Sequence, residues 1–554
     1  MASEDTLQAP VAIVGGGPVG MMLALFLDRH GVQSVVFNTD PSVRVHPKGS
    51  TQNARTLEHY RRLGLAPRMR KLGLPPEHPT DVAYFTRFNG YELARLSMPS
   101  EAEKMSRRVA APETDQLVEP ILRANQMYVE AVLLEHLHRQ PNVTLRFGAT
   151  VTAFRQDIDG VSLEAECDNG ANEQWRVQYL AGCDGGKSFV RRTLGIRYEG
   201  SASLDQAFFG PSMVSTYFRA PTLDRDFLGR RRAWQYWVVN PQLRTAVVAL
   251  DGADEFILWS RLSDPDAGVD DNAIRRIVQQ ATGADIPVKI IAHGPWIGGV
   301  ALHAEAFGEG RVWLAGDAVH LFTPTGGFGM NTGIDDAANL AWKLAAVLQG
   351  WGGEGLLASY AQERKPIAVR NTSASRALAQ NIGDVKVPPQ LEENSPAGEA
   401  ARREVGAFLS TFGEEFGSIG VQLGARYDGS PIIAADGTPP ADSFTAYVPS
   451  SVPGGRAPHV WIGADRGIGD SLFDRFGIGF TLLRLGPKPP SAAGFEAAAQ
   501  TRGVPLKVVD IASEPARALY GCDLALIRPD QHVAWRGNAV SADCGSLLAL
   551  VTGG

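Results

Sequence analysis

A glycine-rich motif near the N-terminus, Gly15-Gly16-Gly17-Pro18-Val19-Gly20, constrains the fold more than any other part of the sequence. It follows a short apolar run at residues 11–14 and opens a helical pattern that extends to about Arg29, and a second β-rich run at residues 34–37 completes a strand-helix-strand unit. In such a unit the first glycine permits a tight turn, the second lets the backbone approach a pyrophosphate, and the third lets helix and strand pack closely. A chance glycine turn would look the same in isolation. In this setting the motif predicts a dinucleotide site formed by Gly15, Gly17, Pro18, Val19 and Gly20.

The same fingerprint expects an acidic residue at the end of the second strand, where this chain has Asn38. An Asn amide can hydrogen-bond a ribose hydroxyl, but without the charge-assisted strength of a carboxylate. Asn38 therefore stays among the expected cofactor-binding residues as a departure from the usual pattern.

Composition and charge limit the classes of protein that the chain can belong to. Its 554 residues, 44% of them hydrophobic and 20% charged, are enough for two or three domains with their own cores. The formal charge of -7 is spread without long runs of one sign, so neither nucleic acid nor an anionic membrane is an expected partner. The four scattered cysteines form no CxxC pair and no metal-ligand spacing, and the sequence shows no signal-like start and no apolar stretch of about 18 residues. These features favour a soluble, cytoplasmic protein without a metal site.

Two later motifs add to the glycine-rich one. Cys183-Asp184-Gly185 follows a strand-like run, and a longer motif extends from Gly316-Asp317 through Pro324 to Met330-Asn331. In the longer motif a strand delivers Asp317 to a loop, where its carboxylate can accept hydrogen bonds from ribityl hydroxyls. The helix expected to begin near Met330 would offer free N–H groups and a positive dipole end to the N1 and O2 edge of a flavin. Taken singly, the loop could be only a turn and Asp317 only a helix cap, but the order and spacing of all three motifs favour a flavin site.

With these motifs the chain resembles the FAD-dependent aromatic hydroxylases of the p-hydroxybenzoate hydroxylase fold, in particular the phenol hydroxylase-like branch. The resemblance covers about residues 10–375 with specific motifs and continues in a tail that resembles the thioredoxin-like C-terminal domain of that branch. It implies bound FAD as the cofactor. The residues that it implies at or near the flavin, beside the first motif, are Lys48 (where Arg is usual), Arg55, Gln126, Asp184, Gly316, Asp317, Pro324, Gly327, Gly329, Met330 and Asn331.

The expected architecture is an α/β fold with a Rossmann-like FAD-binding domain, an inserted antiparallel β-sheet substrate domain and a C-terminal thioredoxin-like domain. The FAD-binding domain is predicted to be discontinuous, at residues 1–80, 110–195 and 290–380, and the substrate domain to comprise 81–109 and 196–289. Residues 381–445 are expected to form an extended connecting segment with one helix, and residues 446–554 the C-terminal domain. Because the tail lacks a CxxC pair, we expect no dithiol chemistry there and favour a structural or dimer-contacting role, which makes a homodimer possible.

The reaction implied by the resemblance uses NADH or NADPH as a transient co-substrate. The reduced flavin reacts with dioxygen at C4a, and the hydroperoxide delivers oxygen to an electron-rich phenolic or polycyclic aromatic ring. The single dinucleotide fingerprint and the lack of a CxxxxC pair argue against the disulfide reductases, and the lack of a WxWxIP stretch disfavours halogenation. Baeyer-Villiger-type oxygen insertion, a flavin-dependent oxidase or dehydrogenase, and a flavin-bound sensor or binding partner remain as alternatives.

An aromatic-rich segment at residues 205–260, which includes Phe208 and Phe209, is the expected lid and wall for such a substrate. Tyr236 and Trp237 lie on a predicted strand, and Tyr236 is expected to face away from its neighbours Trp234 and Trp237. One face could line a pocket while the other packs the sheet, and core packing is an equal alternative for any one of these residues. No catalytic base can be named, and His320 is expected to stabilise the flavin loop. The candidate catalytic residues are Pro324, Tyr236, Trp237 and Tyr217.

Overall fold

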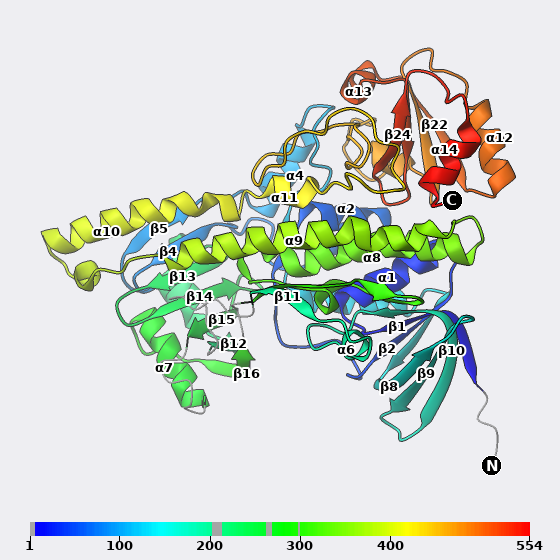
Figure 1. Ribbon diagram of the computed structural model, residues 1–554. Helices are drawn as coiled ribbons and strands as arrows, with labels where there is room; N and C mark the ends of the chain where they lie inside the picture. The colour runs from blue at the N-terminus through cyan, green and yellow to red at the C-terminus, as the bar shows by residue number, and fades with distance from the viewer. Residues whose placement is uncertain (1–5, 202–212, 262–268, 297–299) are drawn as a thin grey trace.

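The glycine-rich motif lies at the carboxyl edge of a parallel sheet (Figure 1). The computed structural model describes residues 6–201, 213–261, 269–296 and 300–554, so Phe208 and Phe209 lie outside the described residues. Five strands run parallel in the order β19-β10-β1-β2-β7. They are β1 (Leu7–Val14), β2 (Ser34–Asn38), β7 (Val143–Phe147), β10 (Asn172–Gly182) and β19 (Val312–Leu314). The strand order reverses at β1, which is where open α/β sheets bind ligands.

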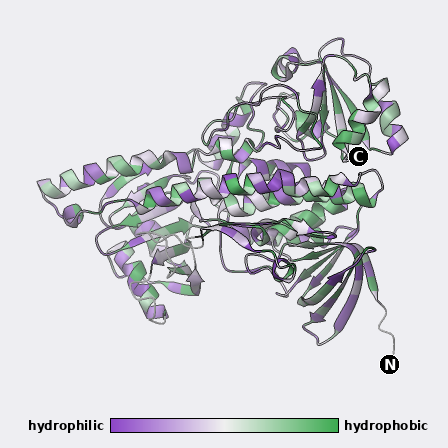
Figure 2. Ribbon diagram, in the orientation of Figure 1, coloured by the Kyte–Doolittle hydropathy of each residue, from purple (hydrophilic) through white to green (hydrophobic). Residues whose placement is uncertain are grey.

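Helices cover this sheet because their apolar side chains pack against the buried side chains of its strands. The last four residues of β1 are buried, and α1 (Pro18–Arg29) is buried along most of its length against α8 (Phe328–Leu348). The helix α5 (Gln126–Leu137) and the long helix α9 (Gly355–Gly383) pack beside these two. A hairpin of β8 (Ala149–Gln156) and β9 (Val161–Cys167) extends the sheet, and its residues alternate between hydrophobic and hydrophilic (Figure 2).

Smaller elements complete this part of the chain. They are β3 (Thr51–Gln52), α2 (Ala54–Arg62), α3 (Ala66–Met69), β6 (Leu122–Arg123), α6 (Phe189–Thr193), β11 (Tyr198–Ser201), β17 (Ala301–Ala304), β18 (Gly308–Glu309) and β20 (His320–Leu321). Within the described residues, no helix is long and apolar enough to cross a membrane.

A second sheet of seven strands, in the order β16-β12-β15-β14-β13-β4-β5, forms the predicted inserted domain. Neighbouring strands are antiparallel except β13 and β4, which are parallel. The strands are β4 (Val82–Phe85), β5 (Glu92–Leu96), β12 (Met213–Arg219), β13 (Gln235–Val239), β14 (Arg244–Ala249), β15 (Glu255–Arg261) and β16 (Lys289–Trp296).

Two boundaries of this domain differ from the sequence prediction. Residues 290–296 belong to β16, which pairs with β12, so they are part of the inserted sheet and not of the FAD-binding region. The prediction places α4 (Glu101–Val109) in the inserted domain, but Lys104 of this helix donates to the carbonyl of Ile121 and Glu101 pairs with Arg70, two residues of the predicted FAD-binding domain. Both boundaries depend on contacts between distant segments.

The connecting segment is more ordered than predicted. It forms α10 (Pro396–Leu409), a 3-10 turn at Ser410–Glu415 and α11 (Ile419–Leu423). The apolar face of α10 packs on one face of the seven-stranded sheet, in the cluster that contains Tyr84, Trp234 and Trp237. The opposite face is covered by α7 (Asp271–Thr282) and packs around Tyr236. The connecting segment is therefore a wall of the inserted domain.

The C-terminal domain has the mixed sheet expected of a thioredoxin-like fold, in the order β22-β21-β23-β24. Its strands are β21 (Phe480–Leu485), β22 (Leu506–Ile511), β23 (Leu524–Ile527) and β24 (Val533–Gly537), and its helices are α12 (Ala493–Arg502), α13 (Glu514–Tyr520) and α14 (Cys544–Val551). All four cysteines are free thiols. Burial raises the pKa of Cys183 and of Cys522, so neither is activated as a nucleophile.

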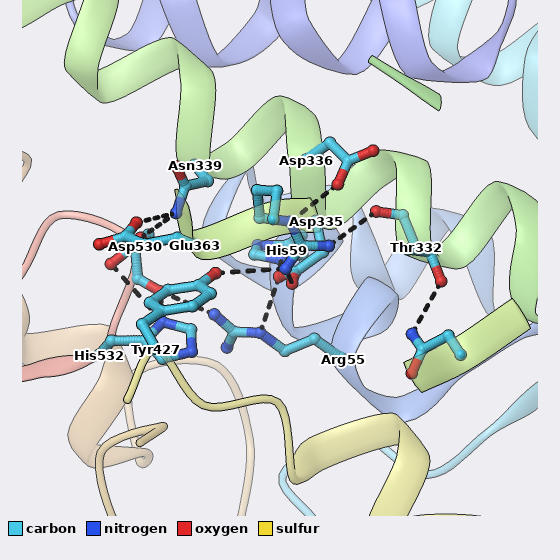
Figure 3. Close-up of polar contacts among 12 residues, drawn as sticks. Arg55, His59, Thr332, Asp335, Asp336, Asn339, Glu363, Tyr427, Asp530 and His532 are labelled. Atoms are coloured by element: carbon cyan, nitrogen blue, oxygen red, sulfur yellow. Dashed lines mark hydrogen bonds and ion pairs between the residues drawn. The ribbon is translucent and has the colours of Figure 1, made fainter. Parts of the chain in front are cut away.

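Buried ion pairs dock the C-terminal domain onto the helices of the first sheet. Glu363 of α9 pairs with Lys343 of α8 at 2.6 Å and with Arg528 of the C-terminal domain, all three fully buried. Figure 3 shows the neighbouring part of this network, in which Arg55 and His59 point toward Asp335. The C-terminal domain is therefore held to α8 and α9 by charges that water cannot screen.

Candidate active site

The glycines of the first motif meet the geometric demands of a dinucleotide turn. Gly15 has φ +111°, and a Cβ there would lie 2.3 Å from the carbonyl oxygen of Cys183. A Cβ on Gly20 would lie 2.0 Å from the carbonyl oxygen of Gly15, whereas a Cβ on Gly17 would meet nothing within 4 Å. Gly17 is the N-cap of α1 and has no side-chain cap, so no side chain satisfies the first N–H groups of the helix. Pro18 occupies the first turn, where its missing N–H costs nothing.

Asn38 is used mainly to hold this turn. Its Oδ1 accepts a hydrogen bond from the Gly16 N–H at 3.1 Å, and its Nδ2 donates to the carbonyl of Asp40 at 2.8 Å. An Asn can make both bonds at once, whereas a carboxylate could not donate the second. The ribose contact of Asn38 stays a prediction.

Asp184, from the second motif, lies next to Gly15 with one carboxylate oxygen in use. Its Oδ2 accepts from the Val190 N–H at 3.1 Å, while its buried Oδ1 has no hydrogen-bond partner among the described residues. Burial raises the pKa of Asp184, and the Ser188 hydroxyl and nearby backbone N–H groups partly offset that shift. A buried oxygen without a partner is costly, so a hydroxyl of a bound ligand would stabilise this site.

The third motif lies beside the first because small residues let the elements approach. A Cβ on Gly316 would lie 2.9 Å from Cγ2 of Val19 at the start of α1. Asp336 of α8 accepts from the Gly316 N–H at 3.1 Å and hydrogen-bonds His320 Nε2 at 2.7 Å, with His320 fully buried. His320 thus stabilises the loop, and the exposed carboxylate of Asp317 faces a cavity.

The start of α8 is a second uncapped helix N-terminus. Gly327 is its N-cap, with φ +66° and no side-chain cap, and α8 begins at Phe328, two residues before the predicted start. Gly329 and Met330 of the first turn line the same cavity. A Cβ on Gly327 would lie 2.9 Å from Thr51, so the backbone is held close to β3. The positive end of α8 is therefore directed at the cavity.

Two predicted flavin residues have structural partners instead. The Asn331 side chain accepts from the Asn53 N–H and donates to the carbonyls of Thr51 and Gly327, so it fixes the start of α8. The Arg55 guanidinium is buried between Glu58, Asp335 and Gln531 and donates to the carbonyl of Asp530 at 2.7 Å. Arg55 therefore holds the C-terminal domain and does not line the cavity, because residues from the far end of the chain cover it. Its contact with the flavin stays a prediction.

The cavity has a volume of about 550 Å³, within the usual range for small-molecule sites. Lys48, Gln126, Asp317, Pro324, Gly327, Gly329 and Met330, all predicted flavin residues, line it together with Trp234, Trp237, Trp259 and Trp296 from the inserted domain. It therefore spans the junction between the two sheets.

The three candidate catalytic residues of the inserted domain are not brought together. Trp237 lines the cavity, whereas Tyr236 packs against Phe85 and Phe88 on the opposite face, and its hydroxyl accepts from the Ala233 N–H. Tyr217 is buried and donates to Glu255 Oε2 at 2.9 Å, outside the cavity lining. Neither tyrosine lines the cavity, because strand pairing places Tyr236 on the opposite face and Tyr217 is bonded to Glu255. Their catalytic roles stay predictions. Trp234 precedes β13, so strand alternation does not apply to it.

Two charged residues in the cavity wall were missed by the sequence analysis. Arg123 of β6 lies 3.9 Å from the centre of the Trp234 ring, and its Nη1 donates to Thr51 Oγ1 at 2.7 Å. Glu415 ends the 3-10 turn after α10 and accepts from the Gly326 N–H at 3.1 Å. Neither belongs to a glycine motif, and no local pattern indicates which side of its segment faces the cavity.

These residues fit FAD. The uncapped start of α1 and the open backbone at Gly17 suit a pyrophosphate. The uncapped start of α8 suits the N1 and O2 edge of a flavin. The unpartnered oxygen of Asp184 and the carboxylate of Asp317 suit hydroxyl groups. No group of three His, Cys, Asp or Glu side chains that could hold a metal occurs in the part of the chain that the structure describes.

Comparison with known proteins agrees with this geometry. Residues 8–375 match a family model described as FAD binding domain, and residues 450–552 match one described as aromatic-ring hydroxylase, C-terminal. The FAD-dependent monooxygenase apdD of Emericella nidulans is 31% identical, over 98% of this chain and 89% of its own.

Two solved structures show the same fold over the whole chain. RebC, solved with bound 7-carboxy-K252c, is 34% identical with a TM-score of 0.88 over 99% of each chain. Aklavinone-11 hydroxylase, solved with FAD and aklavinone, is 27% identical with a TM-score of 0.79 over 100% of each chain.

Proposed function

The chain belongs to the FAD-dependent aromatic-ring hydroxylases, and from this membership we propose that its substrate is a phenolic or polycyclic aromatic compound bound in the cavity between the two sheets. The protein is an FAD-dependent monooxygenase, with NADH or NADPH and dioxygen as its co-substrates. The observation that carries the proposal is the junction of four tryptophans with the loop from Asp317 to Met330. Aromatic walls of this kind bind flat rings by stacking and by apolar burial.

The residues of the chain have separable tasks in this reaction. Bound FAD, reduced by NADH or NADPH, supplies the chemistry that activates dioxygen. The N–H groups at Gly17 and the N-terminus of α1 would hold the pyrophosphate, and Asp317 would accept hydrogen bonds from ribityl hydroxyls. The tryptophan side chains orient the substrate ring and exclude water from the reacting face, and Pro324, which lines the same cavity, would contact the flavin from its loop.

The proposal is tested by following NADH and NADPH oxidation with a panel of phenols and polycyclic aromatics, together with oxygen uptake and product mass. A rate stimulated by one compound, with a product heavier by one oxygen atom, is the expected result. Product connectivity then separates ring hydroxylation from oxygen insertion next to a ketone. Stoichiometric hydrogen peroxide without an oxygenated product would identify an oxidase instead.

Trp237 allows a direct test of the cavity wall. Trp237→Leu keeps an apolar side chain but removes the stacking surface, so we expect the Kd of the stimulating aromatic to rise about tenfold while FAD content stays unchanged. The measurement is a titration of the flavin absorbance with the ligand. Tyr236→Phe, on the opposite face, should leave this Kd unchanged and lower stability only slightly. Equal effects of the two substitutions on Kd would contradict the assignment of the cavity face.

A further inference from the structure

Glu415 is held at a fixed place in the cavity by the connecting segment. The helix α10 approaches β5 so closely that a Cβ on Gly406 would lie 2.2 Å from the carbonyl oxygen of Leu93. On either side of Glu415, Phe412 packs edge-on against Tyr84 and Phe416 packs edge-on against Trp234. These contacts anchor the turn at both ends, so the carboxylate position is set by the fold.

One oxygen of this carboxylate is used and the other is available. The Gly326 N–H donates to Oε1 at 3.1 Å, which ties Glu415 to the loop that carries Pro324. No other hydrogen bond or ion pair of Glu415 occurs among the described residues. The second oxygen is therefore open to a ligand in the cavity that Glu415 lines.

Arg123 lines the same cavity with the opposite charge. The two groups attract each other electrostatically, yet within the described residues they form no ion pair at 4.0 Å or less. Arg123 is instead fixed by its bond to Thr51 and by stacking on Trp234. The cavity thus presents an anionic acceptor and a cationic group that do not neutralise each other directly, which is the arrangement that recognises a hydroxyl able to ionise.

We propose that Glu415 accepts the hydrogen bond, and then the proton, of the substrate's phenolic hydroxyl. In this step the O–H bond of the phenol breaks, an O–H bond forms at Glu415 Oε2, and the electron pair stays on the phenol oxygen, where Arg123 stabilises the negative charge. After the ring is oxygenated, the proton returns from Glu415 to the product. This inference rests on the proposed aromatic substrate and assigns recognition of the phenolic hydroxyl to Glu415.

The protonation equilibrium of Glu415 suits this role. Burial raises the pKa of Glu415 to about 7, against smaller opposing effects of the Gly326 N–H and Arg123. The titratable groups that face it are Arg123 from β6 and Tyr84 from β4, and burial lowers the pKa of Arg123 to about 9. A carboxylate poised near neutral pH is an effective proton acceptor for a phenol.

The test is ligand binding to the FAD-loaded protein, with 2-naphthol and its methyl ether as probes, read from the flavin absorbance between pH 6 and pH 8. The naphthol hydroxyl, like that of tyrosine, ionises well above this range. Above pH 7 Glu415 is a carboxylate and accepts a charge-assisted hydrogen bond, so we expect naphthol to bind the wild-type protein about tenfold more tightly at pH 8 than at pH 6. The ether, which has no proton to donate, should show no such dependence.

Glu415→Gln keeps a carbonyl oxygen for the Gly326 N–H but cannot take up a proton. It should remove the pH dependence and weaken naphthol binding at pH 8 about tenfold, without loss of FAD. Glu414→Gln, the same change on the exposed neighbour, should behave as wild type. A pH dependence caused by His46, His293 or Asp317 elsewhere on the cavity wall would persist in Glu415→Gln.

Three results would overturn the assignment. They are a pH dependence that persists in Glu415→Gln, the same dependence for the ether in the wild-type protein, and wild-type protein that binds naphthol equally at both pH values or not at all. Because neither NAD(P)H nor turnover is needed, this binding result is separate from the hydroxylation assay. Oxygenation could fail while Glu415 recognises phenols, or succeed while Glu415 plays no part.

Discussion

Glu363→Ala is expected to lower the free energy of unfolding by about 3–5 kcal/mol, because removing one partner of a buried ion pair leaves charge in a medium that cannot solvate it. Glu363 pairs with Lys343 and Arg528, and it also accepts hydrogen bonds from Asn339 and Ser430, all at fully buried or nearly buried positions. Burial alone would raise the pKa of Glu363, but Arg528 and Lys343 outweigh it and hold the pKa at about 2.

The two cations would respond differently to that loss. Burial already lowers the pKa of Lys343 to about 8, although Glu363 opposes the shift, so Lys343 can shed its proton once the carboxylate is gone. Arg528 cannot deprotonate, and among the described residues Asp530 is the counter-ion that it keeps. The expected result is a loosened C-terminal domain as well as a lower unfolding midpoint.

Urea unfolding, followed by tryptophan fluorescence, measures this effect. Glu399→Ala removes the same side chain from an exposed ion pair with Arg403, 65% and 69% exposed, and should change stability by less than about 0.5 kcal/mol. If Glu363→Ala unfolded at the same urea concentration as this control, the buried network would not be what docks the C-terminal domain.

Gly20→Ala is expected to weaken FAD binding about 100-fold, equivalent to roughly 3 kcal/mol. An added Cβ would lie 2.0 Å from the carbonyl oxygen of Gly15, which is backbone and cannot turn aside. The helix α1 must therefore move away from β1, and its free N–H groups leave the position in which they can hold a pyrophosphate.

The ratio of flavin to protein absorbance after gel filtration reports this change directly. Gly413→Ala is the matched control, because a Cβ there meets nothing within 4 Å, and it should purify with the wild-type flavin content. A Gly20→Ala protein that retains full flavin content would show that the close packing of α1 on β1 is not required for the cofactor.

The C-terminal domain shows where local patterns are insufficient. The apolar run at residues 457–462 is typical of a strand, but the structure gives these residues only an isolated bridge at Trp461. Their backbone N–H groups donate to separate loops, Ala457 to the carbonyl of Gln531, Trp461 to that of Glu113 and Ile462 to that of Asp470. An apolar run predicts that a segment is buried, but its bonding partners depend on which distant loops surround it.

The sequence alone determined the dinucleotide turn, the flavin loop and the order of the three α/β parts. These features follow from local requirements. Gly15 adopts a positive φ, a Cβ on Gly20 would clash with Gly15 only five residues before it, and a helix directly follows each loop. Only the tertiary structure decided that Trp237 faces the cavity while Tyr236 does not. It also decided that Arg55 binds the C-terminal domain, and that Arg123 and Glu415 line the same cavity. The positions of these side chains result from contacts between segments far apart in the chain, and no local spacing encodes which of those segments come together.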